Sequence, residues 1–337
     1  MKFCCKALFT ASLTAICALS SAAEDTVNYV PRINGAIRSR WEMDLDNDAS
    51  RFQVRNARLS IAGNIAPTID YFVQTDLCDR GKMKILDAWG RLELTEGLKF
   101  QAGQFRMPFG VDPFRAPANY YFANRSVIGK EVCNVRAVGA KLSYAFPRIP
   151  LTLDAGAFNP TSIADHDVWV KTLSYAAKAV YTFRNVALST GFQTIVPDND
   201  RINLFGLGTT WRHDRWIVEG EYMNKHYTHD SHSTCHAYNV FASYAMPVKA
   251  GIFNQASFQG RFDGMTDHSN GTRNSDGVLT TTDPARNRIT VGGTLTHAYK
   301  AVHADFRLNY EKYFYHHGTT PAEGQGDRLV AELVIRF

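Results

Sequence analysis

Residues 33–44 read INGAIRSRWEMD, and mostly apolar or small side chains alternate there with mostly polar ones. The first set comprises Ile33, Gly35, Ile37, Ser39, Trp41 and Met43, and the second comprises Asn34, Ala36, Arg38, Arg40, Glu42 and Asp44. Successive side chains of a β-strand point to opposite faces. The stretch therefore predicts a strand with one apolar and one wet face.

The same alternation recurs along the chain and predicts sixteen strands. The predicted strands cover residues 33–44, 52–65, 68–77, 84–94, 98–106, 136–146, 150–158, 172–184, 185–196, 201–212, 214–226, 235–246, 251–263, 285–297, 301–315 and 326–337. An even number of strands is typical of bacterial single-chain barrels. After residue 23 the apolar runs are too short for a helical membrane span, which needs about 20 residues.

The connections between these strands are sorted by length. Every second connection is a short turn, for example Thr95-Glu96-Gly97, Arg184-Asn185 and His213-Asp214. The alternate connections include the long segments 107–135, 159–171, 264–284 and 316–325. Short turns at one end and long loops at the other are typical of outer-membrane barrels, with the turns in the periplasm.

The wet faces carry many charged residues, which decides where the water lies. They include Arg38, Arg40, Arg58, Glu93, Lys141, Lys178, Glu219, Glu221, Arg261, Asp263, Arg307 and Glu311. So many charges cannot be desolvated cheaply in a dry core. The apolar face must then point outward into lipid, where every backbone polar group has to be paired and the sheet has to close. We expect a transmembrane antiparallel β-barrel around an aqueous channel.

The N-terminus has the parts of a secretory signal peptide: a basic start, an apolar stretch over 7–19 and small residues before Glu24. We expect cleavage near Ala23, so that residues 1–23 are the signal peptide and 24–337 the barrel. Without Lys2 and Lys6, 35 basic and 32 acidic residues remain. This mild excess does not predict a nucleic-acid partner.

Cysteine and histidine patterns predict no catalytic residue, metal site or cofactor. Beyond residue 23, Cys78, Cys133 and Cys235 are widely spaced and allow one disulfide at most. Histidines gather in two expected external loops, at His226, His229, His232 and His236 and at His316-His317. Histidine is a common metal ligand, but no fixed scaffold is apparent here, and a solvated loop is the simpler interpretation. Asp230, Ser231 and His232 are triad residue types, yet adjacent residues cannot adopt the geometry of a triad unaided.

The chain ends in LVAELVIRF, with apolar residues at alternate positions back from Phe337. This ending resembles the C-terminal signal by which the barrel assembly machinery recognises its substrates. We therefore interpret Phe337 as an assembly signal.

Two segments carry a resemblance to a known family. Residues 52–60, FQVRNARLS, and 102–110, AGQFRMPFG, running on to Asn124-Arg125-Ser126, resemble motifs of the phosphate-selective porin O/P family. The resemblance implies a sixteen-stranded porin, a homotrimer, with a constriction loop near 107–135 and an arginine-lined channel that attracts anions. Asn56 stands where the family often has a second arginine, and only one of five basic residues in 106–136 is a lysine.

These observations predict a passive diffusion porin for small anionic solutes, phosphate among them, surrounded by outer-membrane lipid. The candidate residues of the ion pathway are Arg38, Arg58, Arg106, Arg115, Arg125, Lys130 and Arg136. The alternative for these arginines is that they hold the loop to wall carboxylates such as Asp76, Asp87 or Glu93. The alternative functions are a barrel enzyme and an adhesin without an open channel.

Overall fold

The structure is a computed structural model that describes residues 27–79, 81–133, 136–160, 169–198 and 200–337. The predicted signal peptide, residues 1–23, lies outside the described residues. In the part of the chain that is described, no helix is long and apolar enough to cross a membrane.

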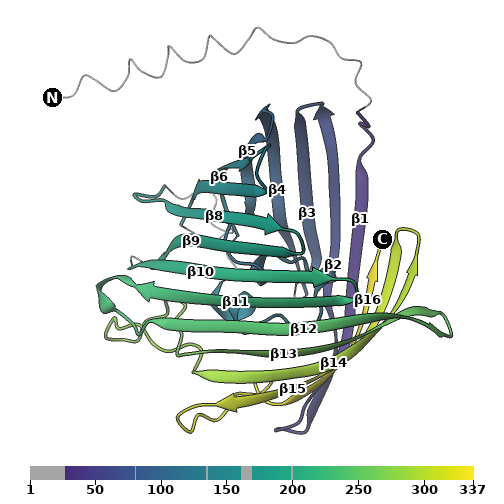
Figure 1. Cartoon of the computed structure of the whole chain (residues 1–337). Coiled ribbons are helices and arrows are strands. Elements are labelled where there is room, and N and C mark those ends of the chain that lie inside the picture. Colours follow the sequence, from purple (N-terminus) through teal and green to yellow (C-terminus); the bar gives the residue numbers. More distant parts are fainter. Residues whose placement is uncertain (1–26, 80, 134–135, 161–168, 199) are drawn as a thin grey trace.

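Sixteen antiparallel strands form one closed barrel, in which each strand pairs with its sequence neighbours and β1 pairs with β16 (Figure 1). The strands are β1 (Arg32–Asp44), β2 (Ala49–Ala66), β3 (Ile69–Asp79), β4 (Lys82–Thr95), β5 (Leu98–Arg106), β6 (Arg136–Ala145), β7 (Leu151–Phe158), β8 (Ser174–Phe183), β9 (Val186–Asp198), β10 (Asp200–His213), β11 (Trp216–Tyr227), β12 (Cys235–Ala250), β13 (Phe253–Met265), β14 (Arg286–Tyr299), β15 (Val302–Tyr315) and β16 (Arg328–Arg336). The predicted fold class and all sixteen strands are confirmed, and each boundary lies within four residues of its predicted place.

The two ends of the chain close the barrel. The backbone N–H of Gly35 donates to the carbonyl of Phe337 at 2.8 Å, and the N–H of Phe337 donates back to Gly35 at 3.1 Å. The ring of Phe337 lies over Gly35, so close that a Cβ added at Gly35 would be 2.1 Å from a ring carbon. Only glycine fits beneath this ring, and Phe337 thereby covers the junction between β1 and the end of β16.

The short turns lie at the end of the barrel where β1 begins and β16 ends. Five of them contain a left-handed residue, which is glycine at Gly97 and Gly251; in the other three, Arg184, Asp214 and Lys300 have φ values of 50°, 49° and 53°. Two-residue turns with positive φ match the twist of the strands they join. The turn expected at Arg184-Asn185 is confirmed, as is the gathering of the long connections at the opposite end.

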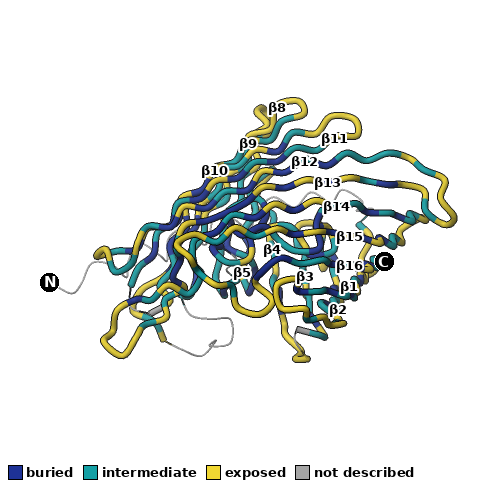
Figure 2. The backbone as a smooth tube through the Cα atoms, turned by 90° about the horizontal axis from the view of Figure 1, so that it is seen from below, coloured by how far each residue is buried: buried dark blue, intermediate teal, exposed yellow. Residues whose placement is uncertain are grey.

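Burial is inverted relative to a soluble barrel. On β15, the outward side chains Phe306, Leu308 and Tyr310 are 45, 46 and 38% exposed, whereas the inward Arg307 and Glu311 are at most 2% exposed. Figure 2 shows buried and exposed residues alternating along the strands. The faces therefore match the predicted assignment, with apolar residues outside and charged residues inside.

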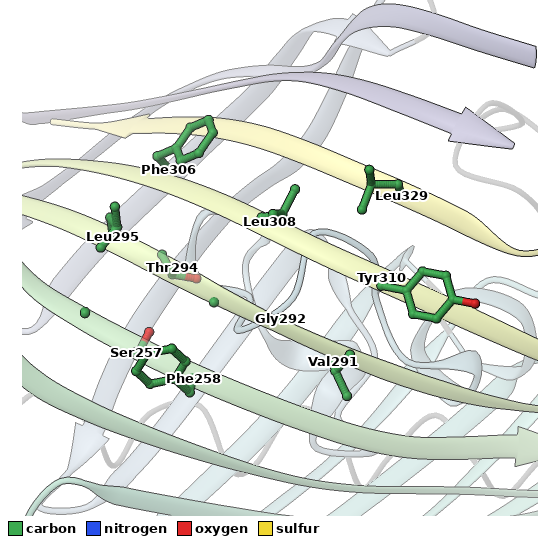
Figure 3. Close-up of a pocket in the computed structure, with 12 residues that line it drawn as sticks. Ser257, Phe258, Val291, Gly292, Thr294, Leu295, Phe306, Leu308, Tyr310 and Leu329 are labelled. Carbon is green, nitrogen blue, oxygen red and sulfur yellow. The ribbon is translucent and has the colours of Figure 1, made fainter. Parts of the chain in front are cut away.

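The outward face also holds an apolar hollow of about 380 Å³ over β13–β16 (Figure 3). Gly293 pairs with Phe258 on one side and Leu308 on the other, and it has no side chain to fill the space between them. Leu295, Phe306 and other apolar residues surround the hollow. A surface of this composition is compatible with lipid tails, not with water.

The face assignment predicts opposite outcomes for two arginine substitutions on β2. Leu59→Arg places a cation on the lipid face at a cost of roughly 2–4 kcal/mol near the membrane centre, and we expect assembly to fail. Gln53→Arg places the same cation on the wet face, and we expect assembly to proceed. Heat-modifiable migration on gels measures folding, and equal behaviour of the two variants would show that the faces are reversed.

The terminal residue leads to a second prediction. If Phe337 is an assembly signal, Phe337→Ala lowers the amount of barrel in the outer membrane more than it lowers the stability of barrel refolded in detergent. Gly35→Ala is the control, because it disturbs the same junction and leaves the C-terminal sequence intact. Equal losses in both variants would reduce the role of Phe337 to packing.

Candidate functional site

The connection from β5 to β6 is packed against inward-facing residues of the barrel. Its described part, residues 107–133, contains three short helices, η1 (Asp112–Phe114), η2 (Pro117–Asn119) and η3 (Ile128–Val132). We call it the inner loop. Its apolar side chains Phe109, Val127, Ile128 and Val132 share one buried cluster with residues of β10 and β11, namely Ile202, Leu204 and Met223.

Glycines on β9 and β10 make room for this loop. Gly191 and Gly206 are paired across the two strands, and a Cβ added to either would lie 3.1 Å from the ring of Phe109. A Cβ at Gly208 would lie 2.5 Å from Val111. The missing side chains let the ring of Phe109, which is 1% exposed, lie directly on the barrel wall.

Two carboxylates of β11 hold the first half of the inner loop. Glu221 accepts hydrogen bonds from the backbone N–H groups of Val111 and Asp112 at 2.7 and 3.1 Å. Glu219 accepts from Arg115 at 2.6 Å. Lys178 on β8 donates to the carbonyl of Gly110. The loop leaves β5 and is therefore fixed six strands further along the barrel.

Residues of β1, β13, β14 and β15 hold the second half. The carbonyl of Ala123 accepts from Arg38 at 2.6 Å, and its N–H donates to Asn309 at 2.6 Å. The N–H of Val127 donates to Asp263 at 2.7 Å. Arg288 donates to the carbonyl of Arg125 at 2.6 Å. With β11 on one side and these strands on the other, the loop is held from two parts of the wall.

Asp112 connects the two halves of the loop. Its carboxylate accepts from the hydroxyl of Ser126 at 2.6 Å and from Arg115 at 2.9 Å. Burial disfavours the charged form of Asp112, but the guanidinium groups of Arg125 and Arg115 outweigh this effect and hold the pKa of its carboxyl below the ordinary value. Asp112 therefore stays charged and cross-links the loop.

A space of about 710 Å³ remains between the inner loop and the wall made by β1–β6 and β14–β16. Its lining is strongly basic, with thirteen cationic side chains against the two carboxylates Asp76 and Glu131. The cations are Arg38, Arg40, Arg51, Arg55, Arg58, Lys84, Arg106, Arg125, Lys130, Arg136, Arg286, Arg288 and Arg328. This space is the candidate ion pathway.

Six of the seven candidate pathway residues line this space, and Arg115 does not. The side chain of Arg115 instead pairs with Asp112 of the loop and Glu219 of β11. Among the six, Arg38 pairs with Glu332, and Lys130 pairs with its neighbour Glu131. These pairs reduce the charge that each cation presents to a solute.

Three wall carboxylates were predicted as loop anchors, and two of them bind residues outside the loop. Asp87 pairs with Arg136 at the flank of the loop, at 3.1 Å. Asp76 pairs with the wall residue Arg58 at 3.0 Å, and Glu93 pairs with Lys99 at 3.3 Å. Asp76 and Glu93 were therefore the wrong choice, and the main loop anchors are Glu219, Glu221 and Asp263.

Arg106 and Arg125 differ from the other lining arginines. Arg106 donates to the carbonyls of Pro113 and Arg115, and Arg125 donates to those of Pro113, Arg115 and Gly129. Among the described residues, neither guanidinium is within ion-pair distance of a carboxylate, and the Nε of each is buried without a hydrogen-bond partner. Their hydrogen-bond partners are thus neutral carbonyl groups, although the charge of Arg125 also acts on the nearby carboxylate of Asp112.

Several lining cations were missed as candidates, including Arg51, Arg55, Arg286 and Arg328. On β2 the reason is a β-bulge: Arg38 pairs with Asn56 but Ser39 pairs with Val54, so Arg55 is an extra residue. The bulge changes which alternate residues face inward, and strict alternation cannot follow that change. The side chain of Asn56 connects β1 and β3, since it accepts from Arg38 at 3.2 Å and donates to Asp76 at 2.7 Å.

The remaining reactive side chains do not gather into a site. In the described ranges, no three His, Cys, Asp or Glu residues are placed to share a metal ion. Cys78, Cys133 and Cys235 are free thiols. The hydroxyl of Ser231 donates to the carbonyl of Thr228, not to a histidine.

The closed sixteen-stranded barrel, with its wet interior and its long connections at one end, defines the class as porin-type outer-membrane barrels. Similar solved structures are the anion-selective porin from Comamonas acidovorans (TM-score 0.61, 11% identity, 91% of this chain and 98% of that chain covered), OmpF of Salmonella typhi in complex with daunomycin (TM-score 0.60, 11% identity, 91% and 97%) and the trimer form of OmpT of Vibrio cholerae (TM-score 0.58, 11% identity, 91% and 98%). At such low identity these structures show the fold alone. No curated protein matches the chain.

The sequence pattern of the family described as phosphate-selective porin O and P matches residues 37–201, from within β1 to the start of β10. This match covers just under half of the chain and confirms the resemblance predicted from the sequence, and the chain is a porin of the Gram-negative outer membrane.

The loop anchors lead to a prediction about channel size. Glu221→Ala removes the acceptor of the buried backbone N–H of Asp112 and the partly buried one of Val111, and a buried group left unsatisfied costs about 1–3 kcal/mol. We expect the inner loop to loosen, and single-channel conductance or current noise in planar bilayers to rise while the barrel still folds. Glu93→Ala is the control, because Glu93 pairs with Lys99 and not with the loop. Identical traces for wild type and Glu221→Ala would contradict this role.

Proposed function

We propose that this chain is a passive diffusion porin that favours small anions, with the inner loop as its constriction. The observation that carries the proposal is the lining of the space beside the loop, thirteen cations against two carboxylates. In a narrow passage with low-dielectric walls, a few like charges focus the field and raise the local concentration of counter-ions.

The placement of the acids supports an anion preference that the overall charge does not suggest. Glu219, Glu221 and Asp263 bind backbone or side-chain donors of the inner loop, and Glu311 and Glu332 pair with arginines of the wall. All five are at most 5% exposed. These carboxylates have little surface available to a passing cation, whereas their partners Arg38 and Arg288 line the open space.

Arg106 and Arg125 are the residues that we expect to contribute most to selectivity. A guanidinium donates two hydrogen bonds at once to phosphate or carboxylate, which suits it to oxyanions. Conduction also requires release, so we expect weak binding at several sites in preference to one tight site. Phosphate is a candidate solute on this chemistry, together with other small anions.

We also propose the remaining parts of the assembly. Residues 1–23 act as a signal peptide, and Phe337 is recognised by the barrel assembly machinery. The mature barrel associates as a homotrimer within outer-membrane lipid. Support for the trimer comes from the similar fold of OmpT of Vibrio cholerae, whose solved structure is described as a trimer form.

A barrel enzyme or an adhesin would have different properties from a porin. An adhesin needs no open passage beside the loop, and an enzyme needs a nucleophile, base and acid held together. Planar-bilayer recording on the purified barrel separates the three, because only a porin gives stepwise conductance. Absence of conductance from folded protein would reject the proposed function.

Ion selectivity tests the roles of the two arginines. We expect the wild type to prefer anions, as measured by reversal potentials across a KCl gradient. Arg106→Gln with Arg125→Gln lowers the anion-to-cation permeability ratio severalfold, and Asn56→Arg, which adds a cation to the wall, raises it. The preference shrinks at high salt because screening shortens the range of the field.

Lys141→Gln is the matched control for this measurement. Lys141 faces the barrel interior but pairs with Asp154 at 2.8 Å and does not line the space. We expect its removal to leave the permeability ratio nearly unchanged. Cation preference in the wild type would reject the anion proposal while leaving the channel in place, and block of chloride current by phosphate would support phosphate as a solute.

A further inference from the structure

The periplasmic end of the barrel carries an excess of exposed positive charge. We define the periplasmic rim by its exposed charged residues. They lie in the short turns, in the two strand residues on either side of each turn, and in the first two residues of β1 and the last two of β16. The acids of the rim are Glu96 and Asp214, and its cations are Arg32, Arg148, Arg184, Arg212, Arg215, Lys249 and Lys300. Apart from Arg32 on β1, the cations form an arc from the β6–β7 turn to the β14–β15 turn.

The opposite end has the reverse charge. By the same definition, leaving out the inner loop, the exposed cations among the described residues of that end are Lys82 and Lys171. The exposed acids there are Asp46, Asp48, Asp230, Asp276 and Glu323. The basic rim is therefore a property of one end of the barrel and not a consequence of the net charge of the chain.

Exposed aromatic rings lie directly beside two of the rim cations. The guanidinium of Arg184 lies 5.2 Å from the ring centre of Phe183, and the ammonium of Lys300 lies 5.3 Å from that of Tyr299. These rings are 56 and 60% exposed. Aromatic side chains favour the boundary between lipid tails and water, so the adjacent cations lie at the level of the lipid headgroups.

We infer that the periplasmic rim binds the phosphate headgroups of anionic phospholipids in the periplasmic leaflet. The exposed guanidinium and ammonium groups match the charge of the phosphates, and the neighbouring rings and apolar outer face accept the acyl chains. Arginine and lysine close to an anionic membrane surface each contribute about 1 kcal/mol of attraction, which corresponds to roughly fivefold in affinity. This binding is independent of the permeation proposed above.

Lipid retention by the folded barrel tests the inference. Purified protein in zwitterionic micelles is titrated with phosphatidylglycerol or with phosphatidylcholine of the same chain length, and bound lipid is counted by native mass spectrometry. We expect the wild type to retain phosphatidylglycerol preferentially. Arg184→Gln with Lys300→Gln weakens that retention by roughly fivefold for each cation removed, and added salt weakens it further.

The matched control removes two exposed cations from the other end, Lys82→Gln with Lys171→Gln. We expect this control to retain phosphatidylglycerol as the wild type does, and heat-modifiable migration confirms that each variant is folded. Equal retention of both lipids by the wild type, or equal losses in the two double variants, would overturn the inference. Equal binding of soluble glycerol phosphate would overturn the assignment to a lipid.

Discussion

Every feature of this molecule depends on the pairing of β1 with β16. A sheet in lipid has no water to satisfy the N–H and C=O groups of an edge strand, so it must close on itself. The pairing of Ala36 with Arg336 through Asp44 with Arg328 removes both edges at once. Closure at sixteen strands also encloses a lumen too wide for wall side chains alone to fill. The fold thus produces an interior that either holds water or is filled by another part of the chain.

The inner loop fills one part of that interior and leaves another part wet. Where it fills, the wall is unlike the rest of the lumen: Ile202, Leu204 and Met223 face inward, and Gly191 and Gly206 provide a flat surface for Phe109. The carboxylates of this region bind the backbone and the arginines of the loop. Burying a carboxylate without such donors would cost free energy. The hydrogen bonds from the loop offset this cost and fix the loop at the same time. Arginines such as Arg58 and Arg136 face the part of the interior that the loop leaves open.

This division explains which features could be predicted from the sequence. The strands and their faces are encoded locally by alternation, so β15 is evident from Phe306 and Arg307 without knowledge of any partner. The anchors join residues far apart in the sequence, such as Val111 and Glu221, which are 110 positions apart. No local pattern specifies such a contact. The sequence alone therefore could not show that Arg115 pairs with Glu219 whereas Arg125 lines the open space. A signal was nevertheless present in β10, whose inward positions Ile202 and Leu204 are apolar in a barrel with a charged interior.

Acidic outer loops repel anions, although the interior that they lead to is basic and attracts them. The distances over which these charges act explain how both can belong to one anion pathway. A strand of 14 residues, such as β10, extends roughly 46 Å at about 3.3 Å per residue. Charges in solvent-exposed loops are screened beyond about 8 Å at physiological ionic strength. Exposed loop carboxylates such as Asp276 are therefore screened by the external solution, whereas the outer-loop carboxylate Asp283 lies 3.7 Å from Arg286 and acts directly on the lining. Inside the barrel the low-dielectric walls focus the field, so the arginines beside the inner loop dominate the potential that a solute meets at its narrowest passage. Net charge and the charge of the outer loops are consequently poor guides to selectivity in this fold, and the residues that line the space beside the loop are the ones that determine it.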